Sequence, residues 1–168
     1  MMFNLKQNLF VVLLISIFSF TLCSIEKGSV SSQVGEQQVR EFVNISGKEY
    51  FVKLASHTWI ESKAECAALN LSLVTFEGPG EYTAVRQAFQ QLGFESFWFW
   101  TDGFRAANSS EWVWLREPSV PISEFHWGPG QPSEDNSEDR CINFRVMSGG
   151  WYGDNCEFPP YYLSYICE

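Results

Sequence analysis

Four of the five cysteines lie between residues 66 and 167, and they are the residues with the plainest chemistry in the chain: Cys66, Cys141, Cys156 and Cys167. Cysteines pair as disulfides in oxidising compartments, and small exported domains depend on such bridges. Four cysteines allow three connectivities, and the residues alone do not choose among them. We therefore expect an exported chain with two disulfides.

The export prediction rests on the first residues of the chain. Lys6 precedes an apolar segment from Leu9 to Phe20, and small or polar residues follow it. A membrane-spanning helix needs about 20 apolar residues, so we expect a cleaved signal peptide at residues 1–23 rather than a retained anchor. Cleavage removes Cys23, the odd cysteine. The predicted location is secreted and extracellular, with no membrane insertion after cleavage.

The acidic side chains offer a second kind of chemistry, because carboxylates can bind calcium. The formal net charge is -9, and loss of Lys6 with the signal peptide moves it to about -10. Such a surface disfavours nucleic acid and anionic membranes as partners, since both are polyanions. One acidic group falls within a long proline-containing segment: Glu134, Asp135, Glu138 and Asp139. Its residues are candidate ligands or simply a solvated loop.

Histidine chemistry gives little support for an enzyme. The chain has two histidines, His57 beside a predicted helix cap and His126 between Phe125 and Trp127. No nucleophile motif surrounds either of them. We interpret both as packing or surface residues and predict that the protein is not an enzyme.

Two helices must position these groups. Thr58 and Glu61 form a capping box that opens a helix over residues 59–69, with one apolar face made of Ile60, Ala64 and Ala67. A second helix is predicted over residues 81–92, where Gly93 ends an apolar stripe made of Tyr82, Val85, Phe89 and Leu92.

Strands dominate the rest of the chain. Aromatic, strand-like runs occupy residues 97–100, 112–115, 141–146 and 161–167, so the fold class is α+β with a mostly antiparallel sheet. The tryptophans in and beside these runs are expected in the core rather than as sugar-stacking platforms: Trp98, Trp100, Trp112, Trp114, Trp127 and Trp151. Between residues 115 and 141 lies a long stretch with little periodicity, and a loop of this length indicates the functional site.

An ordered set of motifs resembles the C-type lectin-like domain. The set runs through Phe97–Trp100, Glu111–Trp114, Trp127–Pro132, Cys141, Trp151, Cys156 and Tyr165–Glu168. The resemblance implies a C-type lectin fold, in the style of a small, short-form invertebrate lectin. We divide the chain into a signal peptide at 1–23, a polar lead-in at 24–38 and a C-type lectin-like domain at 39–168.

The resemblance also implies a pairing and a site. It joins Cys66 to Cys167 and Cys141 to Cys156. It places a calcium ion, which sugar hydroxyls help to coordinate, among four side chains that would bind both calcium and carbohydrate: Gln131, Ser133, Asp139 and Asp154. Tyr152 and Gly153 occupy positions where the family has two further ligands, so calcium binding is expected to be weak. Gln131–Pro132 is equally a structural turn retained without calcium.

The function that follows is a secreted carbohydrate-binding lectin for glycans on cell or microbial surfaces, with a role in innate immunity. Gln131 gives a lean toward galactose-type glycans. The alternative is a calcium-independent protein-interaction module on the same fold. Three sequons, Asn44, Asn70 and Asn108, are candidate glycosylation sites, and Asn70 is expected to be the best exposed because it follows a helix.

Overall fold

The structure is a computed structural model that describes residues 40–133, 138–157 and 163–168. For Arg40 and Asp139 only the backbone is described. Four predicted features lie outside the described residues in whole or in part. They are the signal peptide and lead-in, residue 39 of the predicted domain, Glu134 and Asp135 of the acidic group, and the first residues of the strand expected at 161–167.

The two predicted helices are confirmed, although one of their faces is not. α2 spans Trp59–Ala68 and opens on the Thr58–Glu61 capping box, and α3 spans Glu81–Gln91. The predicted apolar face of α2 is wrong: Ile60 is 49% exposed, and the helix buries Trp59, Ser62 and Cys66 instead. The large Trp59 ring decides the orientation, because it stacks on Phe104 with 5.9 Å between ring centroids, whereas alanines add little burial.

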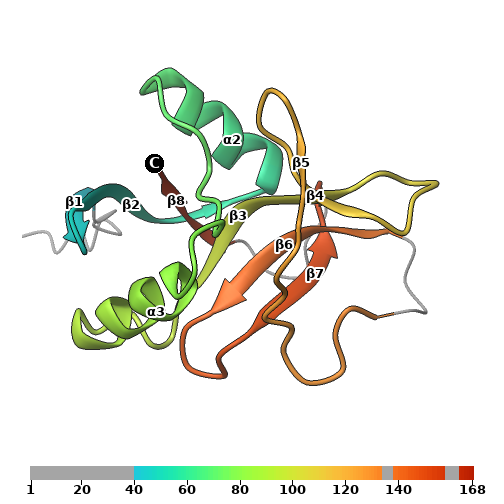
Figure 1. The fold of residues 1–168 in the computed structure, drawn as a ribbon. Coiled ribbons are helices and arrows are strands. Elements are labelled where there is room, and N and C mark those ends of the chain that lie inside the picture. Colours follow the sequence, from blue (N-terminus) through green and yellow to red (C-terminus); the bar gives the residue numbers. More distant parts are fainter. Residues whose placement is uncertain (1–39, 134–137, 158–162) are drawn as a thin grey trace, which may run out of the picture. The chain divides into compact units, whose positions relative to one another are not determined.

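The described strands form one sheet with two branches (Figure 1). One path runs β1-β2-β8-β3-β4-β5, and β6 and β7 extend from the other edge of β3. The bounds are β1 Arg40–Ile45, β2 Lys48–His57, β3 Trp98–Arg105, β4 Trp112–Trp114, β5 Val120–Pro121, β6 Asp139–Arg145, β7 Trp151–Asn155 and β8 Leu163–Cys167. β3 and β8 are parallel and the other named pairs are antiparallel, which confirms the predicted α+β class.

The strand predictions contain no counterpart of the β1–β2 hairpin, of β5 or of β7. Ser46 and Gly47 connect β1 to β2, and both have positive φ angles of 54° and 89°. A two-residue turn of this kind matches the twist of paired strands. β2 then pairs with β8, so the hairpin adds two strands to the sheet near the helices (Figure 1).

Aromatic side chains fill the core between the sheet and α3. Phe144 is fully buried and its ring lies within 6.0 Å of the rings of Phe76, Phe89 and Phe99. Four of the six tryptophans expected in the core are buried, namely Trp100, Trp112, Trp114 and Trp151, while Trp98 and Trp127 are half-buried.

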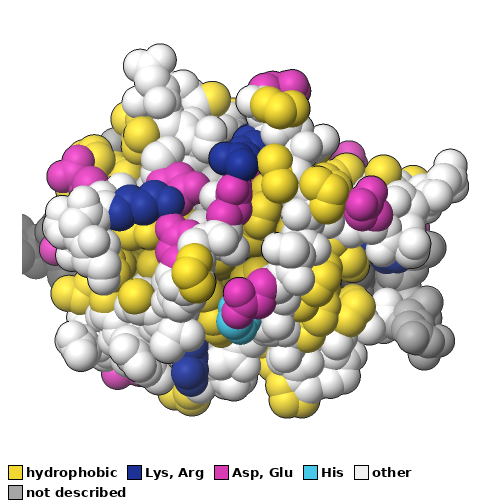
Figure 2. Space-filling view, in the orientation of Figure 1, with side chains coloured by type: hydrophobic (Ala, Val, Ile, Leu, Met, Phe, Trp, Pro, Cys, Tyr) yellow, Lys and Arg dark blue, Asp and Glu magenta, His cyan; other side chains and the backbone are white. Residues whose placement is uncertain are grey.

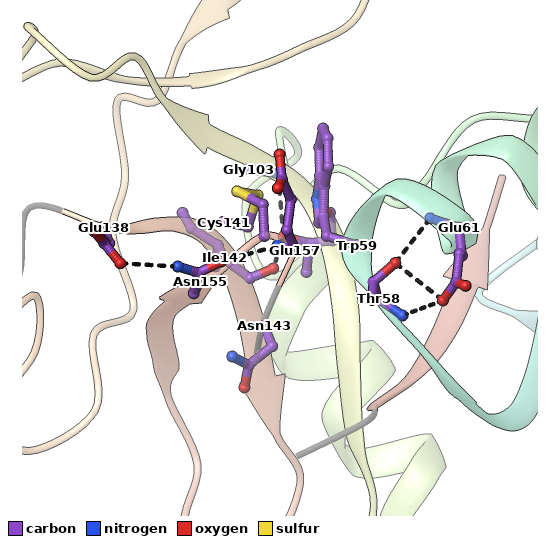
Figure 3. The surroundings of a disulfide bond; sticks show 12 residues. Thr58, Trp59, Glu61, Gly103, Glu138, Cys141, Ile142, Asn143, Asn155 and Glu157 are labelled. Atoms are coloured by element: carbon purple, nitrogen blue, oxygen red, sulfur yellow. Dashed lines mark hydrogen bonds between the residues drawn. A yellow bond between two sulfur atoms is a disulfide. The ribbon is translucent and has the colours of Figure 1, made fainter. Parts of the chain in front are cut away.

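Two disulfides join distant parts of the chain. Cys66 on α2 is bonded to Cys167 on β8, and Cys141 on β6 is bonded to Cys156. Both agree with the pairing that the resemblance implies. The backbone N–H of Trp59 donates to the Cys156 carbonyl at 3.2 Å, so the end of β7 adjoins the start of α2. Figure 3 shows Cys141 in the same region as the Thr58–Glu61 cap.

Candidate functional site

The long loop between β5 and β6 lies along the edge of β7 that does not pair with β6. The backbone N–H of Trp151 donates to the His126 carbonyl at 2.6 Å, and the backbone N–H of Gly128 donates to the Trp151 carbonyl at 2.9 Å. The Gly153 N–H donates to Gln131 Oε1 at 2.9 Å. The Gln131 side chain thereby extends the row of hydrogen bonds along β7, where its amide oxygen takes the place of a backbone carbonyl.

Close packing accompanies these hydrogen bonds. A Cβ atom added at Gly128 would lie 2.5 Å from Tyr152 Cζ, and one added at Gly150 would lie 2.5 Å from Gly128 Cα. Atoms that close would overlap. The loop and β7 therefore approach each other at a distance that only glycine permits at these two positions.

His126 is a packing residue of this loop. Its ring stacks on Tyr82 with 4.6 Å between centroids and 26° between planes, and its Nε2 lies 3.4 Å from Glu124 Oε1. Burial raises the pKa of Tyr82, whose hydroxyl accepts a hydrogen bond from Gly150 N–H. The Tyr82 and His126 rings therefore pack the loop against α3.

Asp154 faces away from the long loop. Its Oδ2 accepts a hydrogen bond from Asn143 Nδ2 at 2.5 Å and lies 3.6 Å from an Arg145 guanidinium nitrogen. Burial raises the pKa of Asp154, and these two neighbours oppose the rise. Both lie on β6, whereas Gln131 lies along the opposite edge of β7. Asp154 and Gln131 thus have different hydrogen-bond partners, and a calcium site that joins them stays a prediction.

The remaining predicted ligands are only partly described. Ser133 is half-buried, and the backbone of Asp139 pairs with Asn155 while its side chain lies outside the description. Its neighbour Glu138 accepts a hydrogen bond from Asn155 Nδ2 at 3.3 Å (Figure 3). Within the described ranges, no three His, Cys, Asp or Glu side chains gather as a metal site.

Protein donors already engage part of the predicted donor set, whereas calcium takes six to eight oxygen ligands. The Gln131 oxygen accepts a backbone N–H, and Asp154 is engaged on β6. Tyr152 holds its ring 3.7 Å from the Arg145 guanidinium carbon, and Gly153 has no side chain. A calcium ion would therefore compete with protein donors for Gln131 Oε1 and Asp154 Oδ2.

Phe125, an exposed aromatic residue of the loop, was not predicted as part of a site. Phe125 is 41% exposed, and its ring stacks on Trp127 at 5.6 Å with 12° between planes. Trp127 meets Trp112 edge-on at 5.0 Å, and the Arg105 guanidinium lies 5.1 Å from the Trp112 ring centre. Hydrophobic side chains gather in the middle of the face shown in Figure 2, along the path of this loop.

A family model identifies the domain. The lectin C-type domain model matches residues 55–168, which is more than half of the chain. The chain belongs to this family. Its fold is the C-type lectin fold, in agreement with the solved structures described next. Members of the C-type lectin family are generally binding proteins. Neither described helix is long and apolar enough to cross a membrane.

Three comparisons illustrate the likeness. Human C-type lectin domain family 4 member A is 26% identical over 122 residues, which cover 71% of this chain and 50% of that protein. The SPL-1–GlcNAc complex has a TM-score of 0.59 at 25% identity, covering 75% of this chain and 90% of the other. A calcium-independent type II antifreeze protein has a TM-score of 0.58 at 17% identity, covering 78% and 95%.

The chain spans half the length or less of the mammalian relatives that it matches. Among the solved structures of this fold, one is a complex with GlcNAc and another is that of a calcium-independent antifreeze protein. The C-type lectin domain thus supports a carbohydrate-binding protein as the functional class.

Proposed function

We propose that this chain is a secreted lectin that binds carbohydrate through the outer surface of its long loop, with calcium contributing little to the affinity. The observation that carries the proposal is the row of hydrogen bonds between β7 and three loop residues, His126, Gly128 and Gln131. Because protein atoms hold the loop against β7, its outer surface is positioned without a bound ion.

The exposed ring of Phe125 supplies the main contact in this proposal. One face of a pyranose ring carries mostly C–H groups, and these pack favourably against an aromatic ring. Stacking on Trp127 holds the Phe125 ring in place, so little side-chain freedom remains to be lost on binding. The exposed carboxylate of Glu124, 63% accessible, accepts hydrogen bonds from sugar hydroxyls beside that ring.

Weak dependence on calcium follows from the engaged ligands. Gln131 Oε1 and Asp154 Oδ2 each hold a protein donor, so calcium would compete with existing hydrogen bonds. The expected preference for galactose-type glycans was inferred from Gln131 as a calcium ligand. This preference stays a prediction, which a glycan array can test. Glycans on cell or microbial surfaces remain the proposed partners.

A protein-interaction module is the second candidate. The same exposed Phe125, beside the acidic Glu124, also suits a basic or aromatic partner surface, because aromatic residues dominate protein interfaces. The two candidates share a surface and differ in ligand. A glycan array separates them directly.

The experiment is a glycan array probed with the secreted protein in calcium and again in chelator. We expect binding in both conditions, with the signal reduced about tenfold or more in Phe125→Ala. Phe42→Ala is the matched control, since Phe42 is an exposed phenylalanine on β1, and it should bind as the wild type does. Binding that disappears in chelator would contradict the minor role of calcium, and an array without any signal would favour the protein-interaction module.

A further inference from the structure

The outer face of β1 pairs an exposed aromatic ring with a glycosylation sequon. Side chains alternate between the two faces of a strand. Val43 and Ile45 pack against the main core, so Phe42 and Asn44 lie on the opposite face of β1. The pairing of β1 with β2 is continuous from Arg40 to Ile45, with no bulge to disturb this alternation.

Phe42 presents its ring to solvent beside this asparagine. It is 58% exposed, and its ring meets Phe51 edge-on at 5.2 Å. Residues two apart on a strand are separated by about 7 Å, which places the Phe42 ring within reach of a sugar ring attached at Asn44. A single exposed phenylalanine is ordinary on a protein surface, so the inference depends on its position relative to Asn44.

The Asn44 side chain is already oriented by the turn that follows it. Its Oδ1 accepts a hydrogen bond from Gly47 N–H at 3.2 Å. This bond uses the oxygen, whereas an N-linked glycan is attached to the nitrogen Nδ2. Glycosylation and the hydrogen bond are therefore compatible, and the bond limits the directions in which the first sugar can point.

The other two sequons lack this neighbour. Asn70 and Asn108 are also exposed, but the residues two positions before them are Ala68 and Ala106. A methyl group offers little surface to a sugar ring. Asn70 and Asn108 thus serve as comparison sites that lack a preceding aromatic ring.

We propose that Asn44 carries an N-linked glycan whose first sugar ring packs its C–H face on the ring of Phe42. The packing removes apolar surface from water and stabilises the β1–β2 hairpin. The glycan is thus a structural part of the sheet at this edge. The proposal requires passage through the secretory pathway, but it does not depend on sugar binding by the long loop.

The first test is site occupancy in the full chain secreted from eukaryotic cells. Glycosidase treatment in heavy-oxygen water converts each occupied asparagine to a labelled aspartate, which mass spectrometry detects. We expect conversion at Asn44. Secreted protein without conversion at Asn44 would overturn the inference. A chain retained in the cells without any glycan would overturn it together with the proposed secretion, while the glycan-array result would stand separately.

The second test is a double-mutant cycle on unfolding. Ser46→Asn removes the sequon but keeps Asn44, and asparagine tolerates the positive φ of this position. The glycan is expected to raise the folded-to-unfolded ratio by about threefold to tenfold when Phe42 is present, and by much less in Phe42→Ala. The non-additivity of the two changes reports their contact.

The matched control removes the glycan at Asn108 through Ser110→Ala in the same two backgrounds. Its effect should be equal with and without Phe42, since Asn108 has no aromatic neighbour two positions earlier. Equal effects of Ser46→Asn in both backgrounds, on protein shown to be occupied at Asn44, would overturn the proposed packing.

Discussion

The region around α2, α3 and β8 and the region of the long loop are stabilised in different ways. The first region buries rings such as Phe89 and is tied together by Cys66–Cys167. The second combines ring contacts such as that of Trp127 on Trp112 with a row of hydrogen bonds to β7 and with Cys141–Cys156. Apolar burial contributes more per residue than single hydrogen bonds do. The loop can therefore change its outer surface while the framework keeps the fold.

The largest expected difference between the two regions comes from their disulfides. Cys66–Cys167 closes a sequence separation of 101 residues and Cys141–Cys156 one of 15. By the chain-entropy model, replacing the first pair with serines lowers the free energy of unfolding by about 4.7 kcal/mol, and replacing the second by about 3 kcal/mol. Denaturant unfolding of the two double variants measures both values.

The same variants also report on binding. Loss of Cys141–Cys156 should weaken glycan binding more than loss of Cys66–Cys167 does, when both are measured under conditions in which each variant remains folded. The reverse order of binding losses would break the distinction between a framework bridge and a loop bridge.

A smaller effect is expected from the hydrogen bond that Gln131 makes to β7. Gln131→Leu removes the acceptor of Gly153 N–H and should lower the free energy of unfolding by about 1 kcal/mol. Gln131→Glu is the control, because a carboxylate oxygen also accepts the bond. Hydrogen exchange at Gly153 should accelerate in the leucine variant and stay slow in the glutamate variant. Equal exchange in both variants would show that Gln131 does not hold the loop.

The smallest effect concerns Asp154 and depends on pH. Burial raises its pKa in the folded state, so the folded protein binds this proton more tightly than the unfolded chain does. Stability from this group is therefore greatest at low pH and falls as pH rises through the unfolded and folded pKa values. At neutral pH, Asp154→Asn should match or exceed wild-type stability by less than about 1 kcal/mol.

Thermal unfolding from acid to neutral pH tests this sign. The advantage of Asp154→Asn should shrink as the pH falls and Asp154 becomes protonated in the wild type. An asparagine variant that is markedly less stable at neutral pH would show that the pairing with Arg145 outweighs the cost of burial.

The framework was largely predictable from the sequence, because its signals are local. Thr58 and Glu61 mark the start of α2, and the stripe through Tyr82, Val85 and Phe89 marks α3. The hairpin of β1 and β2 also carried a signal, the two-residue Ser46–Gly47 turn between strand-forming residues, which the strand predictions did not use.

The site was less predictable because its contacts are not local. Tyr152 and Gly153 were recognised as departures from the family ligands, but no local pattern shows that Gln131 Oε1 accepts the Gly153 N–H or that Asp154 turns toward Asn143. The exposure of Phe125 depends equally on how the loop meets β7. Length and weak periodicity predicted the long loop as the candidate site, while its outer surface required the fold.

In the proposed function, protein hydrogen bonds rather than calcium hold the long loop against β7. Hydrogen exchange at the amides of Gly128, Trp151 and Gly153, measured in calcium and again in chelator, tests it most directly. All three amides donate to loop or β7 acceptors. We expect these amides to be equally protected from exchange in calcium and in chelator. A loss of this protection on chelation would show that calcium holds the loop.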